Sequence, residues 1–162
     1  MNRFKRFSGL LLVLCMVSVF ILAGCGEKKS GNTIDEPEIT GNYLKEDYSQ
    51  QLLNDGAETM IGFVDMEKTD SGYSVHVVEK EVVKSSSYKE GYYIADTNLV
   101  TDFTLGSDAR IACLEDGKLE VESADDFIKN KASHKDQLFT IYMMGTSAEL
   151  ILGTDPKDVM TK

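Results

Sequence analysis

The sequence is poor in the residue types that build catalytic and metal sites. Its 162 residues include two histidines, His76 and His134, three cysteines and no tryptophan. Neither histidine has a cysteine or a second histidine at the spacing of zinc ligands, so the sequence indicates no metal site. It also contains no Gly-x-Ser-x-Gly pattern, phosphate-binding loop or dinucleotide fingerprint. We therefore expect a chain that is not an enzyme, with no catalytic residues and no cofactor.

Positive charge is also scarce. The chain has 17 Lys and Arg against 27 Asp and Glu, a net charge of −10. Arg3, Lys5 and Arg6 lie in the first 24 residues, where there is no acid, so the rest of the chain is more acidic than the whole. A strongly acidic protein repels the phosphates of nucleic acids. We expect no nucleic-acid partner, whereas a basic protein would be attracted.

The start of the chain follows the pattern of an export signal. Residues 1–9 (MNRFKRFSG) are basic, and Leu10–Ala23 is apolar except for Ser18. This apolar stretch is too short to cross a hydrocarbon core of roughly 30 Å comfortably, since that takes about 20 residues. A basic start followed by a short apolar stretch is typical of a signal peptide. We therefore expect residues 1–24 to be removed and the remainder to be exported.

The end of the apolar stretch resembles a lipobox. Leu22-Ala23-Gly24-Cys25 is similar to the processing site of bacterial lipoproteins, in which small residues precede a cysteine. The resemblance implies that the Cys25 thiol receives a diacylglyceryl group, that cleavage occurs just before Cys25, and that further acylation, for example with palmitate, follows. Several acyl chains hold a protein firmly on a membrane. The segment CGEKKSGN resembles that of small Gram-positive lipoproteins, which implies anchoring by lipid on the extracytoplasmic face of the cell membrane.

Composition divides the exported chain into a tether and one domain. Residues 25–42 are polar and acidic and contain one of the two prolines, so we expect a flexible segment after the lipidated cysteine. Residues 43–162 are long enough for a single hydrophobic core. With Cys15 removed in the signal peptide and Cys25 lipidated, Cys113 has no partner for an intrachain disulfide. Its apolar neighbours predict a buried and unreactive thiol.

Alternation of apolar residues predicts a mostly β domain of the α+β class. We expect six to seven short strands that form a small, strongly bent sheet or barrel. The expected strands lie at 60–66, 73–84, 91–95, 99–105, 109–114 and 118–122, before a final hairpin that turns at Gly145-Thr146-Ser147. In that hairpin Ala148, Leu150 and Leu152 should share a face. The apolar face switches within the second strand, which predicts a bulge or bend near Val77.

Two helices are expected beside the strands. Asn42 is the candidate cap of an N-terminal helix that begins at Tyr43 and stops at Gly56. Ser123, followed by Asp126 at the third helical position, should cap a short helix before the final hairpin. A barrel like that of oligonucleotide/oligosaccharide-binding (OB) proteins places a helix at this point, and other α+β meanders do so as well.

Three tyrosines are the candidate binding residues. Tyr88, Tyr92 and Tyr93 crowd around a loop of Ser, Lys and Gly, a composition suited to contacting a sugar or a protein. Alternatively, Tyr92 and Tyr93 straddle a strand, one in the core and one beside it. The sequence thus favours a lipid-anchored binding or accessory module for a protein or envelope component. It leaves open a domain that senses or helps to transport a small ligand or calcium.

No residue pattern completes a histidine or calcium site. Asp96-Thr97-Asn98 with Asp102 resembles the start of a calcium loop, but Val100 and Ser107 stand where oxygen ligands belong. Acidic clusters further along can gather calcium weakly or simply form a solvated face. We expect His76 to face solvent from the middle of a strand and His134 to lie in a Lys-rich loop.

Overall fold

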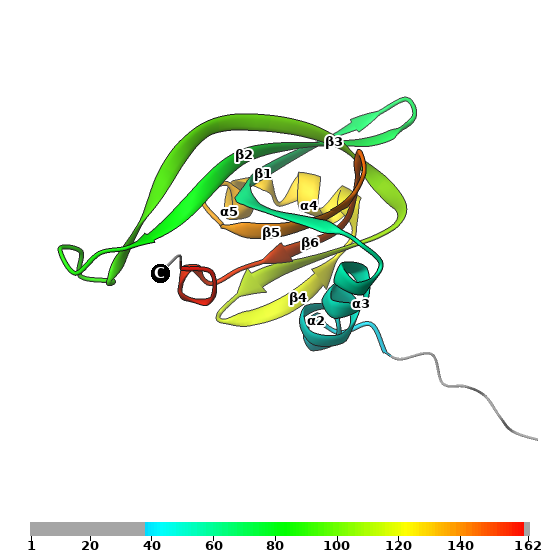
Figure 1. Cartoon of the computed structure of the whole chain (residues 1–162). Coiled ribbons are helices and arrows are strands. Elements are labelled where there is room, and N and C mark those ends of the chain that lie inside the picture. Colours follow the sequence, from blue (N-terminus) through cyan, green and yellow to red (C-terminus); the bar gives the residue numbers. More distant parts are fainter. Residues whose placement is uncertain (1–37, 161–162) are drawn as a thin grey trace, which may run out of the picture. The chain divides into compact units, whose positions relative to one another are not determined.

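Residues 38–160 are the part of the chain that the structure, a computed structural model, describes. The predicted signal peptide, the predicted lipidation site Cys25 and the part of the predicted tether up to residue 37 lie outside these residues. In the described part, strands form most of the ordered elements (Figure 1). They are β1 (Glu58–Thr69), β2 (Gly72–Lys84), β3 (Tyr92–Glu115), β4 (Lys118–Glu122), β5 (Phe139–Met144) and β6 (Ser147–Gly153).

The strands close into a barrel, which confirms the predicted fold class. The sheet order is β2-β1-β5-β6-β3-β4, and β2 also pairs with β3, so β1, β2, β3, β6 and β5 form a closed ring. Neighbours in the ring are antiparallel except β3 and β6, which are parallel. Helices α4 (Ala124–Lys129) and α5 (Lys131–His134) lie between β4 and β5 along the chain. A five-stranded barrel with this Greek-key order has the architecture of an OB-like barrel.

β3 is the element that the sequence did not predict correctly. Three separate strands were expected at 91–95, 99–105 and 109–114, whereas one strand runs through all of them. The polar residues between the expected strands lie where the register shifts. The pairing of β3 with β2 shifts between Val78 and Lys80 of β2, and the pairing of β3 with β6 shifts between Leu105 and Arg110 of β3. Asn98 takes a positive φ of 60° at the first step. The bulge predicted near Val77 therefore lies just beyond it.

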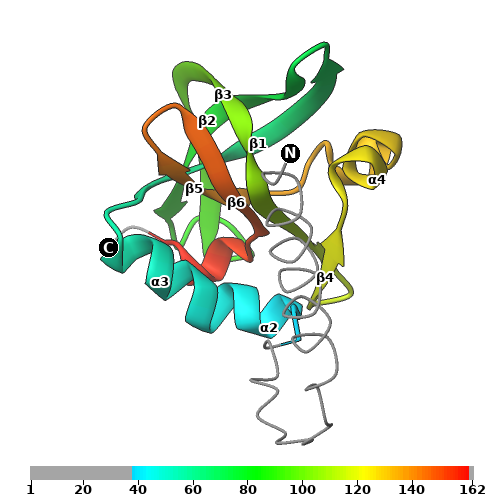
Figure 2. The ribbon, with the colours of Figure 1, turned by 90° about the vertical axis from the view of Figure 1, so that its right-hand side faces the viewer.

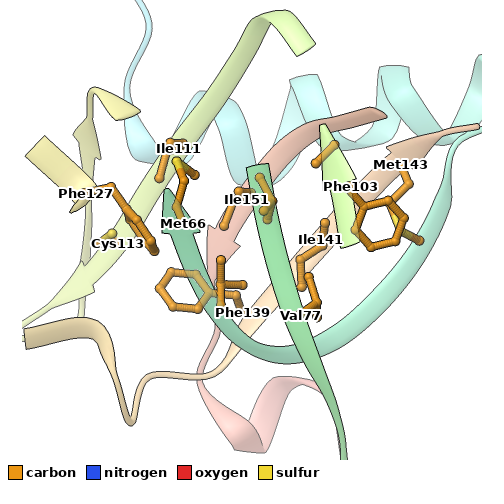
Figure 3. Packing of buried hydrophobic residues seen from close by; sticks show 13 residues of the cluster. Met66, Val77, Phe103, Ile111, Cys113, Phe127, Phe139, Ile141, Met143 and Ile151 are labelled. Atoms are coloured by element: carbon orange, nitrogen blue, oxygen red, sulfur yellow. The ribbon is translucent and has the colours of Figure 1, made fainter. Parts of the chain in front are cut away.

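The barrel interior is filled by alternate residues of the five strands. Val75 and Val77 of β2 are fully buried, and the rings of Phe127 and Phe139 meet edge to face with centroids 5.7 Å apart. Figure 3 shows labelled side chains from β1, β2, β3, β5 and β6 pointing toward one another. Ala148 belongs to this interior cluster, because the register of the β5–β6 pairing shifts between Tyr142 and Met143. Leu150 and Leu152 therefore do not share its face, contrary to the prediction.

An N-terminal helical segment covers the outside of β6 and β3 (Figure 2). It runs without a break through α2 (Gly41–Tyr43), the π-helical η1 (Leu44–Tyr48) and α3 (Ser49–Asn54). Its apolar residues pack on the outward side chains of the barrel in a second cluster, whose buried members are Leu44, Leu52, Ala112, Leu150 and Leu152. The last element of the described residues is a short 3-10 helix, η2 (Pro156–Asp158).

The caps of the helices are partly as predicted. The side chain of Ser123 accepts a hydrogen bond from the Asp126 amide, 3.1 Å away, as expected. The N-terminal helix, however, is capped by Thr40, whose hydroxyl accepts from the Tyr43 amide at 3.2 Å, and not by Asn42. The helix therefore begins at Gly41, two positions before the predicted boundary at Tyr43. The side-chain oxygen of a threonine can cap a helix in the same way as that of an asparagine.

Gly41 fixes how closely the helix approaches the barrel. A Cβ atom at this buried position would lie 2.1 Å from the carbonyl oxygen of Leu119 in β4. Backbone atoms cannot rotate away, so we expect Gly41→Ala to lower the free energy of unfolding by about 1–3 kcal/mol, as overpacking does. Urea unfolding measures this. Asn42→Ala is the matched control because Asn42 is exposed and makes no cap; equal stability of all three chains would contradict the close approach.

Candidate functional site

A row of charged residues crosses the outer face of β1, β2 and β3. His76 pairs with Asp65 on one side and with Asp102 on the other in the strand registers. Because Val75 and Val77 point into the barrel, His76 points outward, as the sequence predicted. Its Nδ1 lies 2.7 Å from the Asp102 carboxylate. The outer face therefore presents one imidazole between two acids.

An apolar row lies next to the charged one on the same face. Phe63, Val78 and Val100 are aligned across the three strands. The ammonium group of Lys80 lies 4.7 Å from the centroid of the Phe63 ring and forms an ion pair with the Asp96 carboxylate. Val100 is 54% exposed, which is high for a valine in a sheet. Apolar surface with charged side chains around it is the usual composition of a binding surface.

Helix α5 turns part of this outer face into a groove. A pocket of about 310 Å³ is lined by Phe63, Val64, Asp65, His76, Val78, Lys131 and Lys135. Lys131 reaches across it to form an ion pair with the Asp65 carboxylate. The groove thus has an apolar floor from two strands and a basic wall from the helix. It offers both apolar contact and charged hydrogen-bonding groups to a bound molecule.

The candidate tyrosines lie at the end of a two-stranded arm. β1 pairs with β2 only as far as Glu79, and residues 80–84 and 92–96 continue as a ribbon that extends from the barrel (Figure 1). We call residues 80–96 the arm. The loop at its tip is closed by hydrogen bonds from the Ser85 amide to Gly91 and from the Gly91 amide to Tyr88. The tip of the arm is therefore closed by its own backbone hydrogen bonds, whereas Val82 nearer the barrel is buried.

Two of the three tyrosines come together on the arm. The rings of Tyr88 and Tyr93 are stacked with their centroids 5.2 Å apart, and their side chains are exposed. Tyr92 is half-buried and lies opposite Lys84 in the pairing of β2 with β3. Neither Tyr92 nor Tyr93 lies in the core, so the alternative that one of them does is wrong. Ile94, Leu99 and Val100 are further exposed apolar residues of β3.

His134 does not lie in a loop as predicted, whereas Cys113 is buried as predicted. His134 ends helix α5, is buried, and stacks on Phe127, so it does not lie in an open loop. The apolar alternation around Phe127 could not reveal this, because the contact depends on how α4 and α5 pack on the barrel. Cys113 is a free and fully buried thiol, as its apolar neighbours indicated.

We expect Cys113 of the folded chain to resist alkylation. Burial raises the pKa of its thiol far above the ordinary 9.0, and the neighbouring Glu122 carboxylate raises this pKa further. Only the thiolate reacts, so labelling by iodoacetamide should stay slow as the pH rises from neutral to 9.0. In urea the same thiol should react increasingly over that range.

A chain with Cys15→Ser and Cys25→Ser leaves Cys113 as its single thiol. Mass spectrometry of this chain in native buffer and in urea gives the two rates. Equal rates under both conditions would show that the thiol is accessible in the folded state.

No helix within residues 38–160 is both long and apolar enough to cross a membrane. No family model matches the chain, and neither a curated protein nor a solved structure shows significant similarity to it.

Proposed function

We propose that this chain is a lipid-anchored binding module on the extracytoplasmic face of the cell membrane, and that it has no enzymatic activity. Its partner would be a basic protein or another basic component of the envelope. The pattern of residues 1–25 supports the anchor. The stacked and exposed rings of Tyr88 and Tyr93 on the arm support the binding role.

The aromatic pair is the observation that carries the proposal. Tyrosine rings bury a large area on binding, lose little side-chain entropy, and are enriched among the residues that dominate interface energies. Two such rings stacked on an exposed arm are already ordered before any partner arrives. Binding would therefore cost little additional ordering at this point.

The charge of the outer face sets the chemistry of the partner. Asp65, Glu67 and Asp102 lie on the outward side of neighbouring strands. Lys131 offsets part of this charge by its ion pair with Asp65, and the whole chain still carries −10. Opposite charge on a partner speeds its encounter with such a surface. In OB-like barrels the face of the second and third strands is the usual binding surface. The arm belongs to β2 and β3, and the outer face includes both of these strands together with β1.

Capture from the envelope tests the proposed function. The full chain is immobilised and exposed to solubilised envelope extract of the native host at low salt and at a few hundred millimolar salt. We expect one or more basic partners that are lost at high salt, because salt screens exposed charges within about 10 Å at 0.1 M and within less at higher concentrations. Capture that does not change with salt would contradict the electrostatic part of the proposal.

Removing the two rings should remove the partner. We expect the double variant Tyr88→Ser/Tyr93→Ser to weaken capture by about tenfold or more, because aromatic anchors each contribute roughly 2 kcal/mol or more when they are central to an interface. Leu53→Ser is the control, since Leu53 is an exposed apolar residue of α3, outside the arm. Equal loss in both variants would indicate nonspecific apolar adhesion instead of recognition by the arm.

A further inference from the structure

Three possible metal ligands meet at one point on the barrel. Cys113 comes from β3, Glu122 from the end of β4, and His134 from the end of α5. Their sulfur, oxygen and nitrogen atoms all lie within 4.8 Å of one another. One carboxylate oxygen of Glu122 is 3.4 Å from the Cys113 sulfur and 3.1 Å from Nε2 of His134.

These side chains are shielded from water. Cys113 is fully buried, the His134 side chain is 3% exposed, and that of Glu122 is 11% exposed. An ionised carboxylate removed from water is costly unless its charge is compensated. Burial of a carboxylate beside a thiol and an imidazole is therefore a costly arrangement for a barrel that could fill this space with apolar side chains.

The surrounding residues hold the three ligands in position. The side-chain Nδ2 of Asn130 donates a hydrogen bond to Oε1 of Glu122, the second carboxylate oxygen, at 3.2 Å. The ring of Phe127 stacks on His134 with centroids 5.0 Å apart and 18° between the planes. Ser123, which directly follows Glu122, caps α4 and so fixes where this helix begins. Such outer contacts orient the ligands of metal sites in proteins.

We propose that Cys113, Glu122 and His134 bind one zinc ion. Thiolate, imidazole and carboxylate are the ligand types that zinc takes in proteins. With Zn–S of about 2.3 Å and Zn–N or Zn–O of roughly 2.0–2.2 Å, ligand atoms around a tetrahedral ion lie roughly 3 to 4 Å apart. The contacts of 3.1 and 3.4 Å fall in this range, and the sulfur and nitrogen atoms lie within 4.8 Å of each other, so a bound ion would draw these two ligands slightly closer. Three protein ligands leave a fourth position for water or another ligand.

The charges and protons of this step balance. Binding breaks the S–H bond of Cys113, forms the bond from sulfur to zinc, and releases the thiol proton to solvent. In the free chain Nε2 of the neutral His134 ring carries the ring proton and donates a hydrogen bond to the Glu122 carboxylate. When Nε2 gives its lone pair to zinc, that proton leaves to solvent and Nδ1 takes one up, so the neutral ring changes tautomer with no net release of a proton. The thiolate and the Glu122 carboxylate together neutralise the two positive charges of the ion. The filled site then has no net charge, which suits its burial better than a carboxylate alone does.

An entry route lies beside the cluster. Glu122 and Ser123 also line a pocket of about 480 Å³ at the end of the barrel, together with Arg110 and Ile111. The carboxylate is thus the ligand nearest to solvent, and the sulfur lies deeper. The sequence did not indicate the site because its ligands are nine and twelve residues apart along the chain. Only the pairing of β3 with β4 and the packing of α5 bring them together.

Competition with a chromophoric chelator tests the site. The full chain with Cys15→Ser and Cys25→Ser, purified in detergent and shown to be folded by circular dichroism, is titrated with Zn²⁺. We expect it to withdraw one equivalent of zinc from the chelator. With Co²⁺ in place of zinc, we expect the near-ultraviolet charge-transfer band of a thiolate bound to cobalt. A folded chain that takes up no zinc, or a cobalt complex without the thiolate band, would overturn the proposal.

Variants separate ligation from adventitious binding. In the same background, Cys113→Ala should weaken zinc binding by more than the roughly 10- to 100-fold that is typical of outer-contact changes, and Asn130→Ala should fall within that range. Asn130 is exposed, so this variant should fold as the parent does. His76→Gln removes the exposed histidine and should leave the affinity unchanged. Unchanged affinity in Cys113→Ala and Asn130→Ala, or a loss in His76→Gln alone, would refute the assignment.

Discussion

A Phe139→Ala chain should lose about 3–5 kcal/mol of unfolding free energy, the range found for aromatic residues truncated in protein cores. Phe139 is fully buried at the start of β5 and meets Phe127 edge to face. Its partners in the ladders on both sides are glycines, Gly62 of β1 and Gly153 of β6. These neighbours have no side chains that could move into the cavity, so the cavity should stay open and its cost should be near the upper end.

Urea unfolding followed by circular dichroism measures the change. Met144→Ala in the same strand is the control, because Met144 is 39% exposed and its truncation should cost within about 0.5 kcal/mol. A loss below about 1 kcal/mol in Phe139→Ala would be too small for a closed barrel with this ring at its centre. It would indicate that β1, β5 and β6 do not enclose the side chain.

The second large effect concerns the proposed membrane anchor. In the native host, Cys25→Ala should abolish incorporation of labelled palmitate, because the lipobox resemblance makes the Cys25 thiol the attachment point. The chain should also keep its leader and migrate as a larger precursor. Acyl chains contribute about 0.8 kcal/mol for each buried methylene group, so their loss removes the firm attachment.

Cys15→Ala is the matched control for this experiment. Cys15 lies inside the apolar stretch of the expected signal peptide, and an alanine there keeps the stretch apolar. This variant should be labelled and processed as the parent is. Continued labelling of Cys25→Ala would exclude Cys25 as the lipidated residue, and loss of labelling in both variants would show a general defect in export.

Local signals predicted those parts of the fold that depend on neighbouring residues. The Ser123 cap, the stop at Gly56 and the final hairpin all rest on side chains within a few positions of one another. The continuity of β3 did not follow from its sequence, because the polar residues near Asn98 look like turn residues and in fact lie in a bulge. Only the partner strand distinguishes a bulge from a turn.

The candidate sites were predictable to different degrees. Composition alone singled out the tyrosines around residue 90, yet which two of them stack depends on the register of β2 and β3. The outer face was not predicted, since Asp65, His76 and Asp102 come from three strands. The same is true of Cys113, Glu122 and His134, whose contacts join a strand, a strand end and a helix end. Long-range pairing carries information that linear spacing does not contain.

The parallel pairing of β3 with β6 has a consequence for the order of folding. It joins residues Thr104–Ala112 to Ser147–Leu152, at the far end of the described chain. A chain that appears from its amino end can form the meander of β1, β2 and β3 early, but its ring stays open until β6 arrives. Contacts between such distant segments form slowly, because the intervening loop must first be closed. The closed barrel therefore reaches its final stability only after β6, near the end of the described residues, is free to pair with β3.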